Sequence, residues 1–259
     1  GDHRDIHSFP TRRSSDLLIV LVLVYLVGFI VAIAGGGGLI ALPAYLFAGI
    51  PVHIAMGTNK LSSSLGTLSA SLTYFYHKKV LLRLALFASF FSLIGSFLGA
   101  QMALMVSPVL LRLRLVLVPL MSLFVLRKEK VIEYTEALKI PWVLIALISF
   151  FVGMYDGYLS PCIGSILIFA FLSFVCMEHT QASANAKIVN LASGVAAFTA
   201  FAMNGQVDLK LGLWAALFSV LGNYSGSLLA IRFGKRIIQP LLIFVFGLLM
   251  LKLIYDLVV

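Results

Sequence analysis

Two lysines, Lys60 and Lys187, stand inside long apolar stretches of this 259-residue chain, and each has a side-chain amide close by in sequence. A buried cation is costly within a membrane, so a lysine in such a stretch indicates a functional site. Ammonium and amide N–H groups both donate hydrogen bonds, which suits a small oxyanion. We therefore predict a donor-rich pocket built from the two lysines and the amides of Asn59, Asn185 and Asn190. The alternative is that each lysine extends its ammonium group to the membrane interface.

Both lysines belong to a duplicated segment of the sequence. Residues 55–100 align without a gap on residues 182–227, at a constant shift of 127 positions (187 − 60). A duplicated apolar unit is a common plan of secondary transporters, whose binding site lies at the interface between the repeats. The alignment therefore predicts two homologous repeats, with Lys60 and Lys187 at the same depth.

Two helix breaks lie at matching positions of the repeats, one at the four consecutive glycines 35–38 and one around Pro161. Glycine costs a helix about 1 kcal/mol relative to alanine, so four in a row favour a break over a packing motif. The N-terminus of a broken helix carries a positive partial charge that suits an anion. The residues at the breaks that are predicted to bind the substrate are Gly36, Gly37, Gly38, Pro161 and Gly164.

One carboxylate, Asp156, precedes the second break in the segment Tyr155–Cys162. An acidic residue at this depth can carry a proton or form an ion pair with Lys187. A helix cap or a purely structural ion pair would explain Asp156 equally well. We treat it as the candidate residue for proton coupling.

The composition places the chain in a lipid bilayer, since 61% of its residues are hydrophobic and 11% are charged, with a mean hydropathy of +1.06. The apolar runs approach or reach the roughly 20 residues that a membrane-spanning helix needs, and they lack the alternation of a β-barrel. The net charge of +9 comes from short clusters of Lys and Arg between apolar runs, which is typical of membrane topology and not of nucleic-acid binding. We predict an all-α, polytopic helical protein of the inner cell membrane.

The first 17 residues, GDHRDIHSFPTRRSSDL, are polar and end abruptly at an apolar run. They resemble the translation of a sequencing-library adapter, so we expect a non-native tail without packing and exclude it from the fold. The rest of the chain is expected to comprise a first transmembrane repeat, a cytoplasmic linker and a second transmembrane repeat, with boundaries at 18–126, 127–140 and 141–259.

Apolar runs separated by turn residues predict eight to ten membrane helices, including short broken or re-entrant pieces at residues 39–48 and 165–176. The longer helices are expected over residues 17–34, 52–76, 82–106, 141–159 and 182–203, with a further helix that ends at Leu126.

The orientation of the two repeats depends on whether the short pieces cross the membrane. Five crossings in each repeat would make the repeats inverted, whereas four crossings, with the short pieces re-entrant, would make them parallel. Basic clusters at residues 78–83, 127–139 and 232–236 all fall on the cytoplasmic side only if the repeats are inverted. We therefore favour inverted repeats.

The segments described above resemble the TauE/SafE sulfite-exporter family of membrane permeases. The resemblance is carried by GGGGLIALPAYLFAGIPVHIAMGTNKL, GMYDGYLSPCIGSIL and ASANAKIVNLASG, and it extends from Leu17 to the C-terminus. It implies transport of small sulfur-containing anions, such as sulfite or sulfonates, coupled to the proton gradient. The residues that it places at family motif positions are Thr58, Asn59, Lys60, Lys187 and Asn190.

Together these features predict a secondary transporter in which one repeat rocks against the other, with a small anion and the lipid bilayer as its partners. The sequence contains no metal cluster, cofactor motif or catalytic Ser/His/Asp set, so we expect no enzyme activity, and homo-oligomerisation stays open. Two alternatives remain, a thiol–disulfide electron carrier that uses Cys162 and Cys176, and a passive anion channel.

Overall fold

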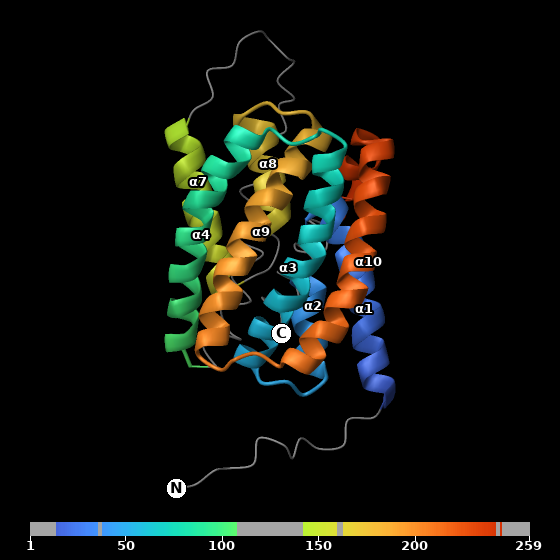
Figure 1. The fold of residues 1–259 in the computed structure, drawn as a ribbon, viewed down its shortest axis with the longest axis vertical. Helices are drawn as coiled ribbons and strands as arrows, with labels where there is room; N and C mark the ends of the chain where they lie inside the picture. The colour runs from blue at the N-terminus through green and yellow to red at the C-terminus, as the bar shows by residue number, and fades with distance from the viewer. Residues whose placement is uncertain (1–13, 36–37, 108–141, 160–162, 242–243, 245–259) are drawn as a thin grey trace, which may run out of the picture.

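The computed structural model describes residues 14–35, 38–107, 142–159, 163–241 and 244. Within these ranges the chain is helical, with turns and short loops between the helices and no strand (Figure 1). The predicted linker and the predicted helix before it lie outside the described residues, as do residues 1–13 of the polar tail. The main helices are α1 (Ser14–Ala34), α2 (Gly38–Phe47), α3 (Val52–Tyr76), α4 (Leu82–Met105), α7 (Trp142–Tyr158), α8 (Ile163–Phe174), α9 (His179–Met203) and α10 (Leu209–Phe233). Residues 235–241 are also helical.

The helix boundaries follow local sequence signals closely. Pro51 occupies the N-cap of α3, as expected for a residue that lacks an N–H group and fits the start of a helix. The predicted helices over 52–76 and 82–106 are confirmed to within one residue. Helix α9 begins at His179, three residues before the predicted start, and α1 begins at Ser14, inside the predicted tail.

The surface of the bundle is suited to lipid. Helices α4, α9 and α10 are long and apolar enough to cross a membrane. On α10 the leucines at positions 209, 213, 217 and 221 recur every fourth residue and are each more than half exposed, so they form one continuous apolar face. Serines such as Ser62 and Ser219 are buried instead. Apolar side chains outside and small polar side chains inside confirm the prediction of a polytopic helical membrane protein.

Both predicted helix breaks are present. Helix α1 ends at Ala34 and α2 begins at Gly38, while α7 ends at Tyr158 and α8 begins at Ile163. Helices α2 and α8 contain 10 and 12 residues, so at 1.5 Å per residue they extend about 15–18 Å, well short of the roughly 30 Å hydrocarbon layer. The two short helices therefore end inside the bundle and bring chain breaks to membrane depth.

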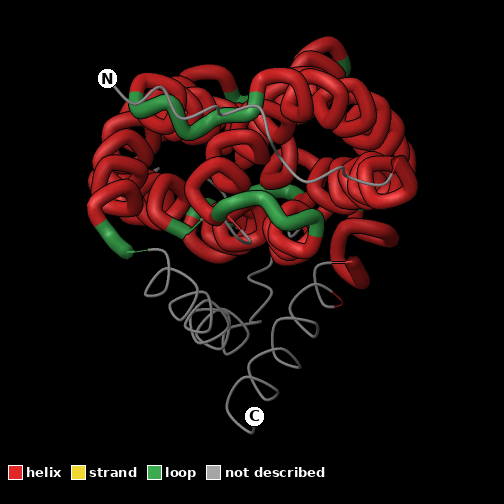
Figure 2. The backbone as a smooth tube through the Cα atoms, turned by 90° about the horizontal axis from the view of Figure 1, so that it is seen from below, coloured by secondary structure: helices red, strands yellow, loops and turns green. Residues whose placement is uncertain are grey.

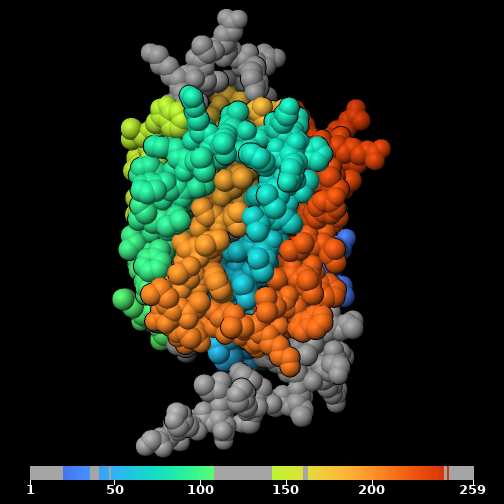
Figure 3. Space-filling model, in the orientation of Figure 1, coloured from blue at the N-terminus to red at the C-terminus, as the bar shows by residue number. Residues whose placement is uncertain are grey.

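Helices α3 and α9 pack side by side in opposite directions at the centre of the bundle (Figure 1). The α3–α4 loop, residues 77–81, lies at one end of the molecule, and the α9–α10 loop, residues 204–208, lies at the other. The space-filling view shows α9 between α4 and α3 (Figure 3), and the view along the bundle shows the helices end-on (Figure 2).

Packing between the two halves is reciprocal, because α4 packs on α7 and α1 packs on α10. Glycines mediate both contacts. A Cβ atom added at Gly99 would lie 2.0 Å from the backbone oxygen of Met154, and one added at Gly226 would lie 2.4 Å from the backbone oxygen of Phe29. These glycines therefore let the paired helices approach closely. Reciprocal packing and antiparallel central helices are what inverted repeats predict, and the duplication itself remains a prediction from the sequence.

Candidate functional site

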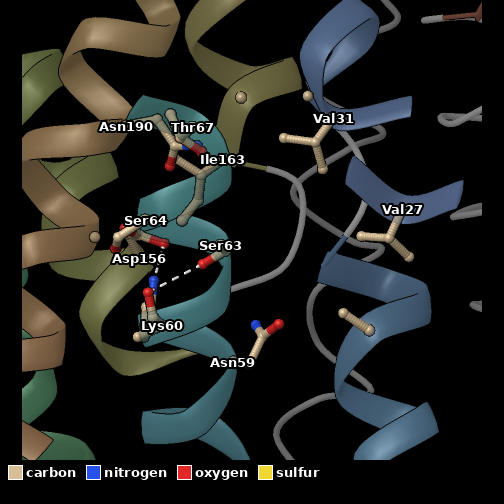
Figure 4. Close-up of a pocket in the computed structure, with 14 residues that line it drawn as sticks. Val27, Val31, Asn59, Lys60, Ser63, Ser64, Thr67, Asp156, Ile163 and Asn190 are labelled. Atoms are coloured by element: carbon tan, nitrogen blue, oxygen red, sulfur yellow. Dashed lines mark hydrogen bonds and ion pairs between the residues drawn. The ribbon is translucent and has the colours of Figure 1, made fainter. Parts of the chain in front are cut away.

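A cavity of about 50 Å³ lies inside the bundle, where Gly35 at the end of α1 and Gly164 in the first turn of α8 meet α3 and α9 (Figure 4). Its walls come from α1, α2, α3, α7, α8 and α9. The polar side chains that line it are Asn59, Lys60, Ser63, Ser64, Thr67, Asp156 and Asn190.

Helix α3 supplies most of this polar lining. Asn59, Lys60, Ser63, Ser64 and Thr67 are spaced so that they share one face of an α-helix, and that face borders the cavity. Across the cavity α9 contributes only an amide and a glycine. The polar wall therefore comes mainly from the first half of the chain.

Lys60 forms a buried ion pair with Asp156 of α7 at the edge of this cavity. The side chains are 4% and 3% exposed, so the alternative of a lysine reaching the membrane interface is wrong for Lys60. The expected pairing of Asp156 with Lys187 is not what forms. Asp156 lies near the C-terminal end of α7, which packs mainly on α4 and also on α8 and α9, and this placement brings its carboxylate to Lys60 instead.

Lys187 is also fully buried, so the interface alternative is wrong for it as well. However, Lys187 does not line the cavity: its ammonium group donates to the backbone carbonyl of Val31, in the last turn of α1. The same carbonyl also accepts a hydrogen bond of 2.9 Å from the backbone N–H of Gly35, and the C-terminal end of a helix carries a negative partial charge. The prediction that both lysines share one pocket is therefore wrong.

The two helix breaks cross each other at a pair of glycines. A Cβ atom added at Gly164 would lie 2.5 Å from the Cα atom of Gly35, so the backbones touch where any side chain would separate them. Gly35 also has a φ angle of +80°, which favours glycine. Both glycines and Ile163 line the cavity, and so the first turn of α8 borders it. The positive partial charge of that helix N-terminus is available to an anion.

The remaining predicted residues have mixed outcomes. Thr58 lies outside the cavity lining, and its hydroxyl accepts a hydrogen bond of 2.9 Å from the backbone N–H of Asp208. Gly38 begins α2, whereas Gly36, Gly37 and Pro161 lie outside the described residues.

Sequence reasoning missed Ser63, Ser64, Thr67 and Gly194, which also line the cavity. The signal that could have found the first three is the helical period counted forward from Lys60. Ser64 is of particular interest because its buried hydroxyl has no hydrogen-bond partner among the described residues. Gly194 faces Ser64 directly, and a Cβ atom there would lie 2.6 Å from the Ser64 hydroxyl oxygen.

A buried ion pair and two helix breaks around a cavity, inside a bundle with a lipid-compatible surface, define the class of membrane transporters built from broken helices. A family model described as "Sulfite exporter TauE/SafE" matches residues 20–253, and the chain belongs to this family.

Similar proteins agree with this assignment. The chain is 34% identical over 244 residues to a "Probable membrane transporter protein" of Haemophilus influenzae, covering 93% of this chain and 96% of that protein. It is 32% identical over 248 residues to the "Probable membrane transporter protein YfcA" of Escherichia coli K12, covering 92% and 89% of the two chains. No solved structure matches. The protein is thus a multi-pass membrane transporter and not an enzyme.

Proposed function

We propose that this transporter moves a small, sulfur-containing anion such as sulfite or a sulfonate across the cell membrane together with a proton. Lys60 supplies the positive charge that the anion binds, and Asp156 carries the proton. The observation that supports this mechanism is the Lys60–Asp156 ion pair at the edge of the central cavity.

Charge balance explains why an anion and a proton would travel together. The ion pair has no net charge, so a monovalent anion entering the cavity alone would leave one uncompensated negative charge away from water. Such a buried charge costs several kcal/mol even after the protein relaxes. A proton on Asp156 removes this penalty, because it frees the Lys60 ammonium group to pair with the anion.

The neutral groups around the ion pair suit an oxyanion. The amides of Asn59 and Asn190 and the hydroxyl of Ser64 can donate to its oxygens, and the first turn of α8 adds a positive partial charge. A buried hydroxyl without a partner is uncommon in folded proteins, and a bound oxyanion would supply the acceptor that Ser64 lacks.

The size of the cavity favours the smaller members of this substrate class. One water molecule needs roughly 10–15 Å³ of cavity volume, so a cavity of about 50 Å³ has room for about four atoms of that size. Sulfite has four non-hydrogen atoms and fits this volume. A sulfonate with a carbon chain requires the cavity to widen, for example when α1 and α8 separate at Gly35 and Gly164.

The test is uptake of sulfite into proteoliposomes that contain purified protein and an imposed pH gradient. Wild-type protein should accumulate sulfite above its external concentration, whereas a passive channel would only equalise the two. Lys60→Met should lower the flux at least about tenfold, which corresponds to about 1.4 kcal/mol of lost substrate interaction. Asp156→Asn should abolish accumulation driven by the pH gradient.

The matched control is Lys210→Met, which removes the charge of an exposed lysine at the start of α10. Its uptake should equal that of wild-type protein, and all rates are normalised to folded protein recovered after reconstitution. Accumulation of sulfite by Asp156→Asn to the wild-type level would show that Asp156 does not carry the proton. Unchanged flux in Lys60→Met would remove Lys60 from the binding site.

A further inference from the structure

The C-terminal end of α1 is surrounded by side-chain donors. Helix α1 stops inside the bundle, where Ala32, Ile33 and Ala34 are buried. The last carbonyls of a helix lack the regular partners that the helix interior supplies, although the Val31 carbonyl accepts a hydrogen bond of 2.9 Å from the backbone N–H of Gly35. Each of the last four carbonyls receives a hydrogen bond from a side chain of another helix. The bonds run from Lys187 to Val31, from Tyr74 to Ala32 (3.0 Å), from Ser183 to Ile33 (3.2 Å) and from Ser165 to Ala34 (2.5 Å).

This arrangement has the chemistry of a cation site. Carbonyl and hydroxyl oxygens are the ligands that hard monovalent and divalent cations take in proteins. In broken-helix transporters the C-terminal ends of half-helices coordinate cations, because the helix dipole makes these ends negative. At the end of α1 the group at this position is the Lys187 ammonium, which is fully buried and forms no ion pair within the described parts of the chain.

We propose that Lys187 is a tethered cation that occupies a cation site at the end of α1 and thereby positions the wall of the transport cavity. The link to the cavity is direct, because Val31 and Gly35, at the end of the same helix, both line it. Lys187 itself does not line the cavity, so it is a positioning residue and not a substrate ligand. The proposal holds for any transported anion and does not depend on proton coupling.

The two matching lysines thus have different electrostatic partners. The charge of Lys60 is balanced by a full carboxylate that can itself change protonation state. The charge of Lys187 is balanced by the partial charges of a helix end, worth about half an elementary charge, and by carbonyl dipoles. Only Lys60 is therefore placed to exchange one anionic partner for another.

The test removes the tethered ammonium and offers free cations in its place. Lys187→Ala leaves space at the helix end for Na⁺ or methylammonium, whereas Lys187→Met removes the charge but still fills the space. Thermal unfolding of the purified proteins is measured in detergent with choline chloride, sodium chloride or methylammonium chloride at equal ionic strength. Lys210→Ala, which changes an exposed lysine, serves as the control for general salt effects.

We expect Lys187→Ala to be less stable than wild-type protein in choline and to regain several degrees, roughly 2–8 °C, in sodium or methylammonium in a saturable manner. Wild-type protein, Lys187→Met and Lys210→Ala should show no such difference between the salts. The anion uptake rate of Lys187→Ala should rise with the same cation concentration, at least about threefold. If Lys187 only filled space, added cations would not restore the stability or the uptake rate of Lys187→Ala.

Equal stability of Lys187→Ala in all three salts would overturn the proposal. If neither neutral variant can be purified, successful purification of folded Lys187→Arg supports the proposal, because a positive charge is then what the helix end requires. If Lys187→Arg cannot be purified in folded form either, the proposal is overturned, because the shape of the lysine side chain would then explain the requirement. Because unfolding is measured without substrate, the outcome is independent of whether sulfite is transported.

Discussion

The Lys60–Asp156 ion pair allows a quantitative test of whether its two charges act as one unit. Asp156→Asn leaves the Lys60 ammonium group buried without its carboxylate, and Lys60→Met leaves the carboxylate without its ammonium group. Both side chains are almost inaccessible, with exposures of 4% and 3%. Removing one partner of a buried pair costs about 3–5 kcal/mol, because an uncompensated charge remains.

The double variant Lys60→Met/Asp156→Asn leaves no charge at all, so it should be more stable than either single variant. Replacing a buried ion pair by neutral groups of similar size is often close to neutral. The destabilisation of the double variant should therefore fall short of the sum of the two single variants by about 3 kcal/mol or more. This difference is the coupling free energy of the pair.

The assay is unfolding of the three variants and wild-type protein in the same detergent. For a chain of this length about 1 kcal/mol corresponds to about 2–4 °C in the midpoint, so each single variant should unfold roughly 6–20 °C below wild type. The double variant should recover most of that loss while transporting no anion. Additive effects, with the double variant least stable of all, would falsify the idea that the two charges neutralise each other.

The remaining predictions concern the edges of the cavity. Gly164→Ala places a methyl group 2.5 Å from the Cα atom of Gly35. This clash should lower the free energy of unfolding by about 1–3 kcal/mol and reduce sulfite uptake. Full uptake with an unchanged unfolding midpoint would contradict the close contact between the two glycines. Ser64→Ala removes a hydroxyl that has no hydrogen-bond partner among the described residues, so it should raise the KM for uptake severalfold while leaving the unfolding midpoint nearly unchanged. Thr58→Val removes the acceptor for the backbone N–H of Asp208, so it should lower stability by about 1–3 kcal/mol at an unchanged KM. A raised KM in Thr58→Val together with lost stability in Ser64→Ala would reverse the roles assigned to these two residues.

Much of the fold could be predicted because its signals are local. The run of apolar residues identifies each helix, Pro51 fixes the start of α3, and the glycines at 35–38 mark the first break. These signals act within a few residues of chain, so they do not depend on the packing of the bundle. The sequence places the start of α9 three residues too late, because the residues directly before Ala182 are polar.

The candidate site was predicted only in part, because its assembly depends on how helices rotate and cross. The burial of both lysines follows from their sequence context and is confirmed. Which lysine meets Asp156 depends instead on how α7 packs against its neighbours α4, α8 and α9, and a helix rotation of 100° per residue moves a side chain from cavity to core. Thr58 and Lys60 illustrate this, since they are two residues apart and face different surroundings.

The amino-acid sequence by itself determined that this protein is a bundle of membrane helices with two breaks and two buried cations. Composition, helical period and backbone-breaking residues are properties of the chain, and lipid permits few other solutions. Only the tertiary structure decided that Lys60 faces a cavity with Asp156 while Lys187 holds the end of α1. The physical reason is that the partner of a buried charge is set by the arrangement of helices that are distant in sequence.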